Sequence, residues 1–123
     1  MQSRMATALA GLALLAVSCS GSTGETTVST AEDGLLQIVA YDRQDFDADL
    51  YEAKAGEVKF ELLLDGFQVH TLVVEGLEDY LRLEVGDQDA DFGSVNLQPG
   101  RYILYCDIAG HRSSGMEARL VVS

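Results

Sequence analysis

The segment YCDIAGHRSSGM, residues 105–116, concentrates side chains that can bind a soft metal ion. Cys106, His111 and Met116 follow one another at equal intervals, with four residues between each pair. A loop of this length can bring a thiolate, an imidazole and a thioether around one point, and these soft or borderline donors suit copper in particular. The segment therefore predicts a copper site built largely from one loop.

The chain has one other histidine, His70, which lies in the segment DGFQVHTLVVEG on an earlier predicted strand. Two imidazoles and one thiolate in a trigonal arrangement, with a long and weak bond to a methionine, form the blue-copper centre used for electron transfer. Strands distant in sequence can lie side by side in a sandwich. His70 can therefore reach the same end of the fold and complete this donor set.

Each of these residues also has a purely structural interpretation. A buried strand cysteine is usually a small hydrophobic residue, a methionine before a strand usually packs in the core, and a histidine among valines and leucines is usually a core residue. Zinc would prefer a fourth donor stronger than methionine. We favour copper because both histidines and the only cysteine after Cys19 fit one template.

Other chemistries are less consistent with the sequence. The acidic runs at 42–49 and 87–91 lack the sixth-position Gly and twelfth-position Glu of an EF-hand calcium loop, so we interpret them as solvated loops or a docking surface. A hydrolase site at the serines beside His111 would also need an orienting acid and an oxyanion hole, and His111 has a stronger claim as a metal ligand.

The elements that must position the donors are predicted to be strands. About seven short segments alternate apolar and polar residues or are rich in β-formers, and turn signals such as QPGR separate them. This spacing predicts an all-β fold, a Greek-key β-sandwich. The expected strands are 35–41, 57–64, 68–75, 80–85, 92–97, 100–106 and 117–122.

The first 33 residues do not resemble a folded domain. Residues 1–18 have a positive residue followed by a short apolar run, which predicts a signal peptide. LLAVSC resembles a bacterial lipobox, so we expect lipid on Cys19, although ordinary signal cleavage nearby is the alternative. Residues 19–33 predict a flexible tether, and residues 34–123 one domain. The protein is thus expected to be exported and held at the outer face of a membrane, at the cell envelope.

The domain resembles the cupredoxins, the small blue-copper proteins of the plastocyanin and azurin kind. VNLQPGRYILYCDIAGHRSSGM is similar to their last-strand signature, VHTLVVEG to their first-histidine segment and YEAKAGEVKFELLLDG to the strand pair before it. The resemblance implies His70, Cys106 and His111 as equatorial ligands of one copper ion and Met116 as the axial ligand. It also implies one-electron transfer between Cu(I) and Cu(II).

Three features depart from the family pattern. Thr71 replaces a frequent Asn that helps to hold the cysteine loop, Ala109 replaces a frequent Pro before the second histidine, and MEARL replaces the more usual small residues after the methionine. None of these changes removes a ligand. The first two lead us to expect a somewhat less rigid loop.

The histidine count favours a carrier over an enzyme. Multicopper oxidases and copper nitrite reductases share the fold, but their additional copper centres need more histidines than the two present here. We expect no enzymatic activity. The alternative is a copper-binding or copper-delivery lipoprotein, or an accessory module, without a redox role.

The charge limits the class of partner. The net charge of −12 disfavours nucleic acid, because phosphates need cationic partners. It favours a redox partner with a basic docking face, such as a cytochrome or an oxidase, and it favours a monomer because copies repel each other. We expect electrons to leave through His111, with Phe67, Ala109 and Gly110 forming a small apolar patch around it.

Overall fold

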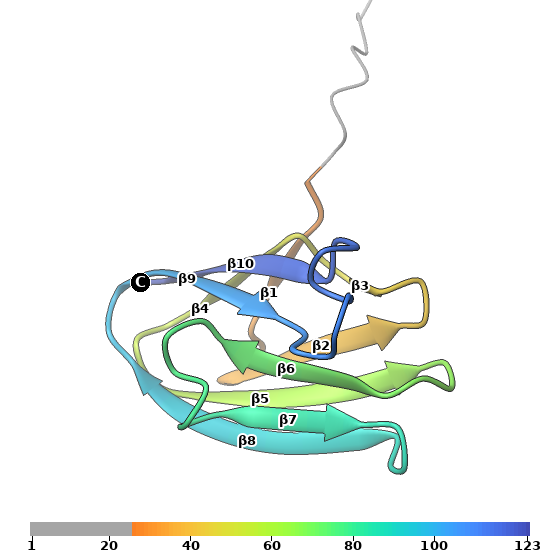
Figure 1. Cartoon of the computed structure of the whole chain (residues 1–123). Coiled ribbons are helices and arrows are strands. Elements are labelled where there is room, and N and C mark those ends of the chain that lie inside the picture. The colour runs from red at the N-terminus through yellow and green to blue at the C-terminus, as the bar shows by residue number, and fades with distance from the viewer. Residues whose placement is uncertain (1–25) are drawn as a thin grey trace, which may run out of the picture.

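The computed structural model describes residues 26–123, which form two β-sheets packed face to face (Figure 1). The larger sheet has the order β1-β4-β10-β9-β6-β7 and the smaller has the order β3-β2-β5-β8. The all-β sandwich is therefore confirmed. The strands of the larger sheet are β1 (Val28–Thr30), β4 (Leu50–Ala53), β10 (Glu117–Val122), β9 (Gly100–Tyr105), β6 (His70–Val74) and β7 (Arg82–Val85). Those of the smaller sheet are β3 (Asp45–Phe46), β2 (Leu35–Tyr41), β5 (Gly56–Asp65) and β8 (Ala90–Leu97).

Alternation along the strands produces the core between the sheets. In β5, Val58, Phe60 and Leu62 are buried, whereas Glu57 and Lys59 face solvent. Successive side chains of a strand point to opposite faces, so each strand contributes one apolar face, and removing these faces from water drives the packing. Residues 26–123 contain no helix that is long and apolar enough to cross a membrane.

The sheet is partly open where the predicted ligands lie. β9 pairs with β10 along its whole length, but β6 pairs with β9 only at Val73–Tyr105 and Val74–Leu104. The start of β6 and the residues that follow β9 therefore lie beyond this short ladder. The start of β6 is still paired with β7, at His70–Val85 and Thr71–Glu84, but side-chain and loop hydrogen bonds must join it to the residues after β9.

The structure has ten strands in the described residues instead of the seven expected, which corrects the strand count. The three additional strands, β1, β3 and β4, have 3, 2 and 4 residues, too few for a periodic pattern to show. β1 lies inside the segment expected to be a tether, where it pairs with β4 in parallel. The predicted signal peptide, 1–18, and Cys19 lie outside the described residues.

Candidate metal centre

The four predicted ligands lie at strand ends, or in the loop between two strands, at one end of the sandwich. His70 is the first residue of β6, Cys106 directly follows β9, and Met116 directly precedes β10. His111 lies in the loop between β9 and β10. His70, Cys106 and Met116 have no exposed surface, and His111 is 9% exposed.

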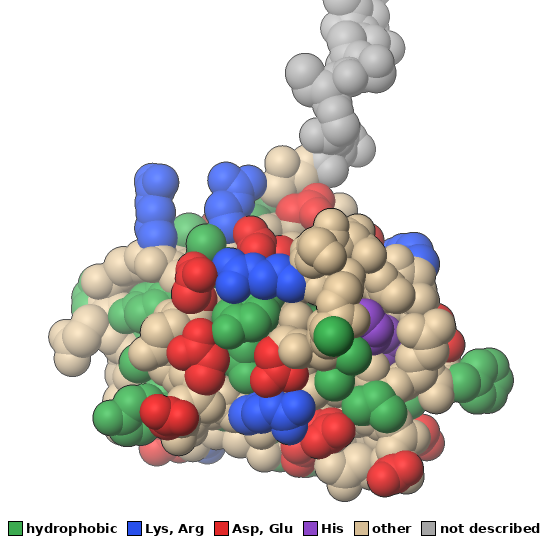
Figure 2. All heavy atoms as spheres, viewed as in Figure 1, with side chains coloured by type: hydrophobic (Ala, Val, Ile, Leu, Met, Phe, Trp, Pro, Cys, Tyr) green, Lys and Arg blue, Asp and Glu red, His purple; other side chains and the backbone are tan. Residues whose placement is uncertain are grey.

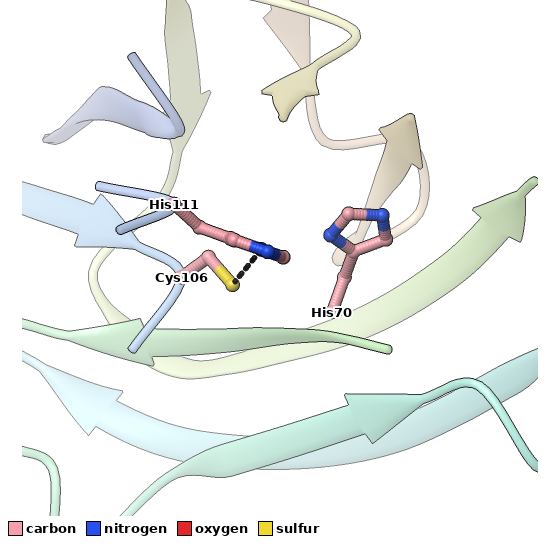
Figure 3. Close-up of side chains that lie close together, drawn as sticks. All are labelled: His70, Cys106 and His111. Carbon is pink, nitrogen blue, oxygen red and sulfur yellow. Dashed lines mark hydrogen bonds between the residues drawn. The ribbon is translucent and has the colours of Figure 1, made fainter. Parts of the chain in front are cut away.

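Cys106 and both imidazoles converge on one point (Figure 3). One potential ligand atom from each lies within 4.8 Å of the other two. The Cys106 sulfur is 3.5 Å from Nδ1 of His111, and the two imidazole centroids are 5.1 Å apart. Figure 3 shows one ring nitrogen of His70 facing the other two side chains.

The two nitrogens of His70 have different surroundings. Its Nε2 lies 3.1 Å from a carboxylate oxygen of Asp42. Its Nδ1 is buried and has no hydrogen-bond partner, the only such side-chain nitrogen or oxygen among residues 26–123. A buried polar atom without a partner is costly. A metal ion at this point would satisfy Nδ1, so the donor set fits a bound ion.

Met116 is tied to the same loop through its backbone. Its carbonyl accepts a 3.1 Å hydrogen bond from the Cys106 amide, and its own amide donates a 3.1 Å bond to the carbonyl of His111. These bonds bring the three loop residues together at the same end of the sandwich. The thioether is fully buried and belongs to the same cluster of core side chains as Cys106.

Thr71, expected to hold the cysteine loop less well than the family's Asn, makes two hydrogen bonds to the residue that follows Cys106. Its hydroxyl accepts a 2.9 Å bond from the Asp107 amide and donates to the Asp107 carboxylate at 2.8 Å. The Thr71 amide points at the Cys106 sulfur from 3.4 Å. An amide donor of this kind stabilises a thiolate, because it hydrogen-bonds the charged form.

Asp107 connects Thr71 to a cation on the neighbouring strand. Arg82 on β7 contacts both oxygens of Asp107, at 2.8 and 3.1 Å. The guanidinium is the main cause that lowers the pKa of Asp107, so the carboxylate is charged at neutral pH. Paired contacts from an arginine fork fix orientation as well as distance.

A second ion-pair cluster holds the other side of the loop. Arg112, directly after His111, binds Glu117 at 2.7 Å and Glu75 at 3.0 Å. Its guanidinium also lies 4.1 Å above the ring of Tyr105. These contacts join the loop to β9, to β10 and to Glu75, the residue that directly follows β6. We expect these contacts to stiffen the loop and so to compensate for Ala109, which restrains the backbone less than the family's proline would.

His111 is the predicted ligand closest to solvent. Burial and the nearby His70 lower the pKa of His111, so at neutral pH its imidazole is uncharged and can bind a metal. Ala109 and Gly110 are exposed, and Phe67 is 95% exposed. Figure 2 shows histidine reaching the surface beside apolar side chains.

Sequence reasoning missed Asp42, which it placed in a solvated acidic run. The Asp42 carboxylate accepts backbone bonds from Phe67 at 2.7 Å and Gln68 at 3.0 Å, in addition to contacting His70. The two backbone bonds are the main causes that lower the pKa of Asp42. No local sequence signal could have revealed this role, because His70 lies 28 residues away.

Comparison with known proteins identifies the fold. The sequence matches no family model and no curated protein. Among solved structures it is similar to reduced auracyanin from the photosynthetic bacterium Roseiflexus castenholzii, with a TM-score of 0.65 and 13% identity, over 76% of this chain and 99% of that one.

Two further structures have the same arrangement. Auracyanin A, a "blue" copper protein from the green thermophilic photosynthetic bacterium Chloroflexus aurantiacus, gives a TM-score of 0.61 at 16% identity, over 76% of this chain and 99% of that one. Rusticyanin, a copper protein, gives 0.60 at 15% identity, over 77% and 82%. The chain therefore has the cupredoxin fold, as the sequence predicts.

Proposed function

We propose that the protein is a one-electron carrier that holds a single copper ion with His70, Cys106 and His111, and with Met116 as a weak fourth ligand. The observation that carries the proposal is the convergence of the three side chains around the unpartnered Nδ1 of His70. The cupredoxin fold and the blue copper neighbours support it.

The ion would supply the redox chemistry, by alternating between Cu(I) and Cu(II). The protein's own residues keep the donors in place and exclude water. His70, Cys106 and Met116 are completely buried, which leaves no open path for a substrate on their side. The loop is held by Thr71 and by the ion pairs of Arg112, so little rearrangement is needed when an electron moves.

Electron exchange is proposed to occur at His111, whose edge reaches the surface. Ala109, Gly110 and the fully projecting Phe67 supply apolar surface suited to brief docking. The remaining surface is strongly acidic, so the proposed partner is basic at its docking face. A partner of this kind, for example a basic cytochrome, would associate faster at low salt.

The proposed place of action is the cell envelope, with lipid on Cys19 holding the domain at the outer face of a membrane. Lipid anchoring predicts that Cys19→Ala moves the protein from the membrane fraction to the soluble fraction. A wild-type protein that is already soluble after export would indicate ordinary signal cleavage.

The visible spectrum is the test of the proposed function. Copper(II) added to the domain without its leader should give an intense visible absorption, caused by charge transfer from the Cys106 thiolate. Cys106→Ser should abolish this band, since a hydroxyl is a much poorer donor. Ser94→Ala, at an exposed position on β8, is a control that should leave it unchanged. Stoichiometric copper binding without colour would contradict the blue-copper assignment.

Copper delivery is the second candidate function. It shares the donor set but requires that copper exchange readily with another protein. The burial of the donors disfavours ready exchange. Rapid transfer to a copper chaperone, measured by loss of the visible band, would favour delivery over electron transfer.

A further inference from the structure

The fold fixes Asp42 beside Nε2 of His70. It directly follows β2, which runs parallel to β5 up to the last aligned pair, Tyr41 and Asp65. This register puts Asp42 next to Gly66 and the loop that leads to His70. Its carboxylate accepts bonds from the backbone of Phe67 and Gln68, so both oxygens are held.

Gly66 is required for this close approach. Its φ is +153°, a conformation that side chains rarely adopt, and a Cβ at this position would overlap the Asp42 carboxylate. The absence of a side chain at residue 66 therefore makes room for the carboxylate. This arrangement distinguishes Asp42 from an ordinary solvated surface acid.

The contact with Asp42 determines which nitrogen of His70 carries the proton. A carboxylate accepts hydrogen bonds, so the Nε2 that faces it at 3.1 Å must be the protonated nitrogen of a neutral imidazole. The buried Nδ1 is then left with a free lone pair that faces Cys106 and His111. This is the form in which His70 can bind a metal.

The charge of Asp42 is not neutralised by a neighbouring cation. The adjacent Arg43 forms its ion pair with Asp45, at 3.7 Å, and stacks on the ring of Tyr41, at 4.1 Å. Within residues 26–123, no lysine or arginine forms an ion pair with Asp42, and the side chain that contacts its carboxylate is that of His70. No neighbouring cation therefore offsets the negative charge beside this imidazole.

We propose that Asp42 is a positioning residue that fixes the tautomer of His70 and lowers the reduction potential of the copper site. This inference rests on the proposed function. A carboxylate bonded to the far nitrogen of a ligating imidazole makes that imidazole a stronger donor. A stronger, more negative donor set favours Cu(II), which has the greater positive charge, over Cu(I).

The tautomer is tested without copper. In the apoprotein, at a pH at which the His70 imidazole is neutral, nitrogen-15 NMR should show the proton on Nε2 and none on Nδ1. Asp42→Asn should shift the equilibrium toward the Nδ1-protonated form, because an amide is a weaker acceptor than a carboxylate. A wild-type His70 protonated at Nδ1 would overturn the inference whatever the variants do.

The potential is tested on the copper-loaded protein. Outer-shell partners of a metal ligand typically contribute 10–100-fold to metal affinity. If Asp42→Asn weakens Cu(II) binding about tenfold relative to Cu(I), the potential rises by about 59 mV. Asp87→Asn is the matched control, because it removes the same charge from an exposed loop and should shift the potential much less.

Gly66→Ala provides a second variant if Asp42→Asn does not fold. It retains every charge but displaces the carboxylate, so it should move the tautomer and the potential in the same direction. Equal potentials for Asp42→Asn and Asp87→Asn, or no shift in Gly66→Ala, would refute the role of Asp42. A wild-type protein without the visible band would instead refute the copper proposal, and the apoprotein NMR would still test the tautomer.

Discussion

Replacing Thr71 by Val tests whether the threonine hydroxyl holds the ligand loop. The hydroxyl is fully buried and makes two bonds to Asp107, one at 2.9 Å to its amide and one at 2.8 Å to its carboxylate. Valine has nearly the same shape but removes both bonds. The amide of Asp107 then loses its partner, whereas the partly exposed carboxylate retains Arg82 and water.

The expected loss of stability follows from these contacts. A neutral hydrogen bond contributes about 1 kcal/mol net, and stranding a buried donor costs about 1–3 kcal/mol. We take about 1 kcal/mol for the Asp107 amide that loses its partner, because its hydrogen bond is only part-buried. With the lost hydrogen bond itself, Thr71→Val should lower the free energy of unfolding by about 2 kcal/mol. In a domain of this size each kcal/mol lowers Tm by about 4–8 °C, so Tm should fall by about 8–16 °C.

Urea unfolding and thermal melting of the apoprotein, followed by circular dichroism, measure this effect. Thr71→Ser is the matched control, since it keeps the hydroxyl and loses one methyl group, at a cost of about 1 kcal/mol. The bond from the Thr71 backbone amide to the Cys106 sulfur survives in both variants. Both should therefore still give the visible band with copper. A Val variant as stable as the wild type, or no more unstable than the Ser variant, would refute the reasoning.

Three other predictions address the axial ligand, the core and the surface. Met116→Leu should retain copper and raise the potential, and Met116→Gln should lower it, as voltammetry would show; unchanged potentials would mean that Met116 only packs in the core. Tyr51→Phe should destabilise the domain by about 1–3 kcal/mol, because the buried hydroxyl accepts a bond from the Ala48 amide and donates to Asp47. Burial raises the pKa of Tyr51 well above its unfolded value of 10.0. The protonated hydroxyl therefore contributes its full stabilisation below about pH 10, and this stabilisation is lost as the pH rises further. Alkaline unfolding should depend less on pH in the Phe variant. The rate of electron transfer to a basic cytochrome should fall as salt rises from about 0.01 to 0.3 M, and neutralising the three acids of segment 87–91 should weaken this dependence if that segment docks.

The sequence predicts the long strands and the donor residues because their signals are local. Cys106, His111 and Met116 lie within one short loop, so the chain itself keeps these donors near one another. The alternation in segment 57–64 is long enough to identify β5, whereas the two-residue β3 and three-residue β1 show no period and form only because a neighbouring strand offers hydrogen-bond partners.

Asp42 shows why the surroundings of the site could not be predicted. Its contact with His70 depends on the register between β2 and β5 and on the space left by Gly66, and neither leaves a pattern in the sequence around residue 42. Thr71 illustrates a different difficulty. The family's preference for Asn suggested that Thr71 holds the loop less firmly. How firmly Thr71 holds it depends on Asp107, whose amide donates to the Thr71 hydroxyl and whose carboxylate accepts from it.

The residues that directly follow the four predicted ligands have one feature in common, since each makes a polar side-chain contact that holds the site. Thr71 and Asp107 bond to each other, Asp107 also binds Arg82, and Arg112 binds Glu117. The composition alone suggests a uniformly acidic surface, but the acidic residues are of two kinds. Those next to the ligands are paired with arginines and hold the loop, so neutralising one of them should weaken the site and, because it leaves an arginine unpaired, also lower the attraction of a basic partner. Acids outside the ion pairs found among residues 26–123, such as Asp87, can instead be neutralised to change the attraction of the partner without loosening the loop.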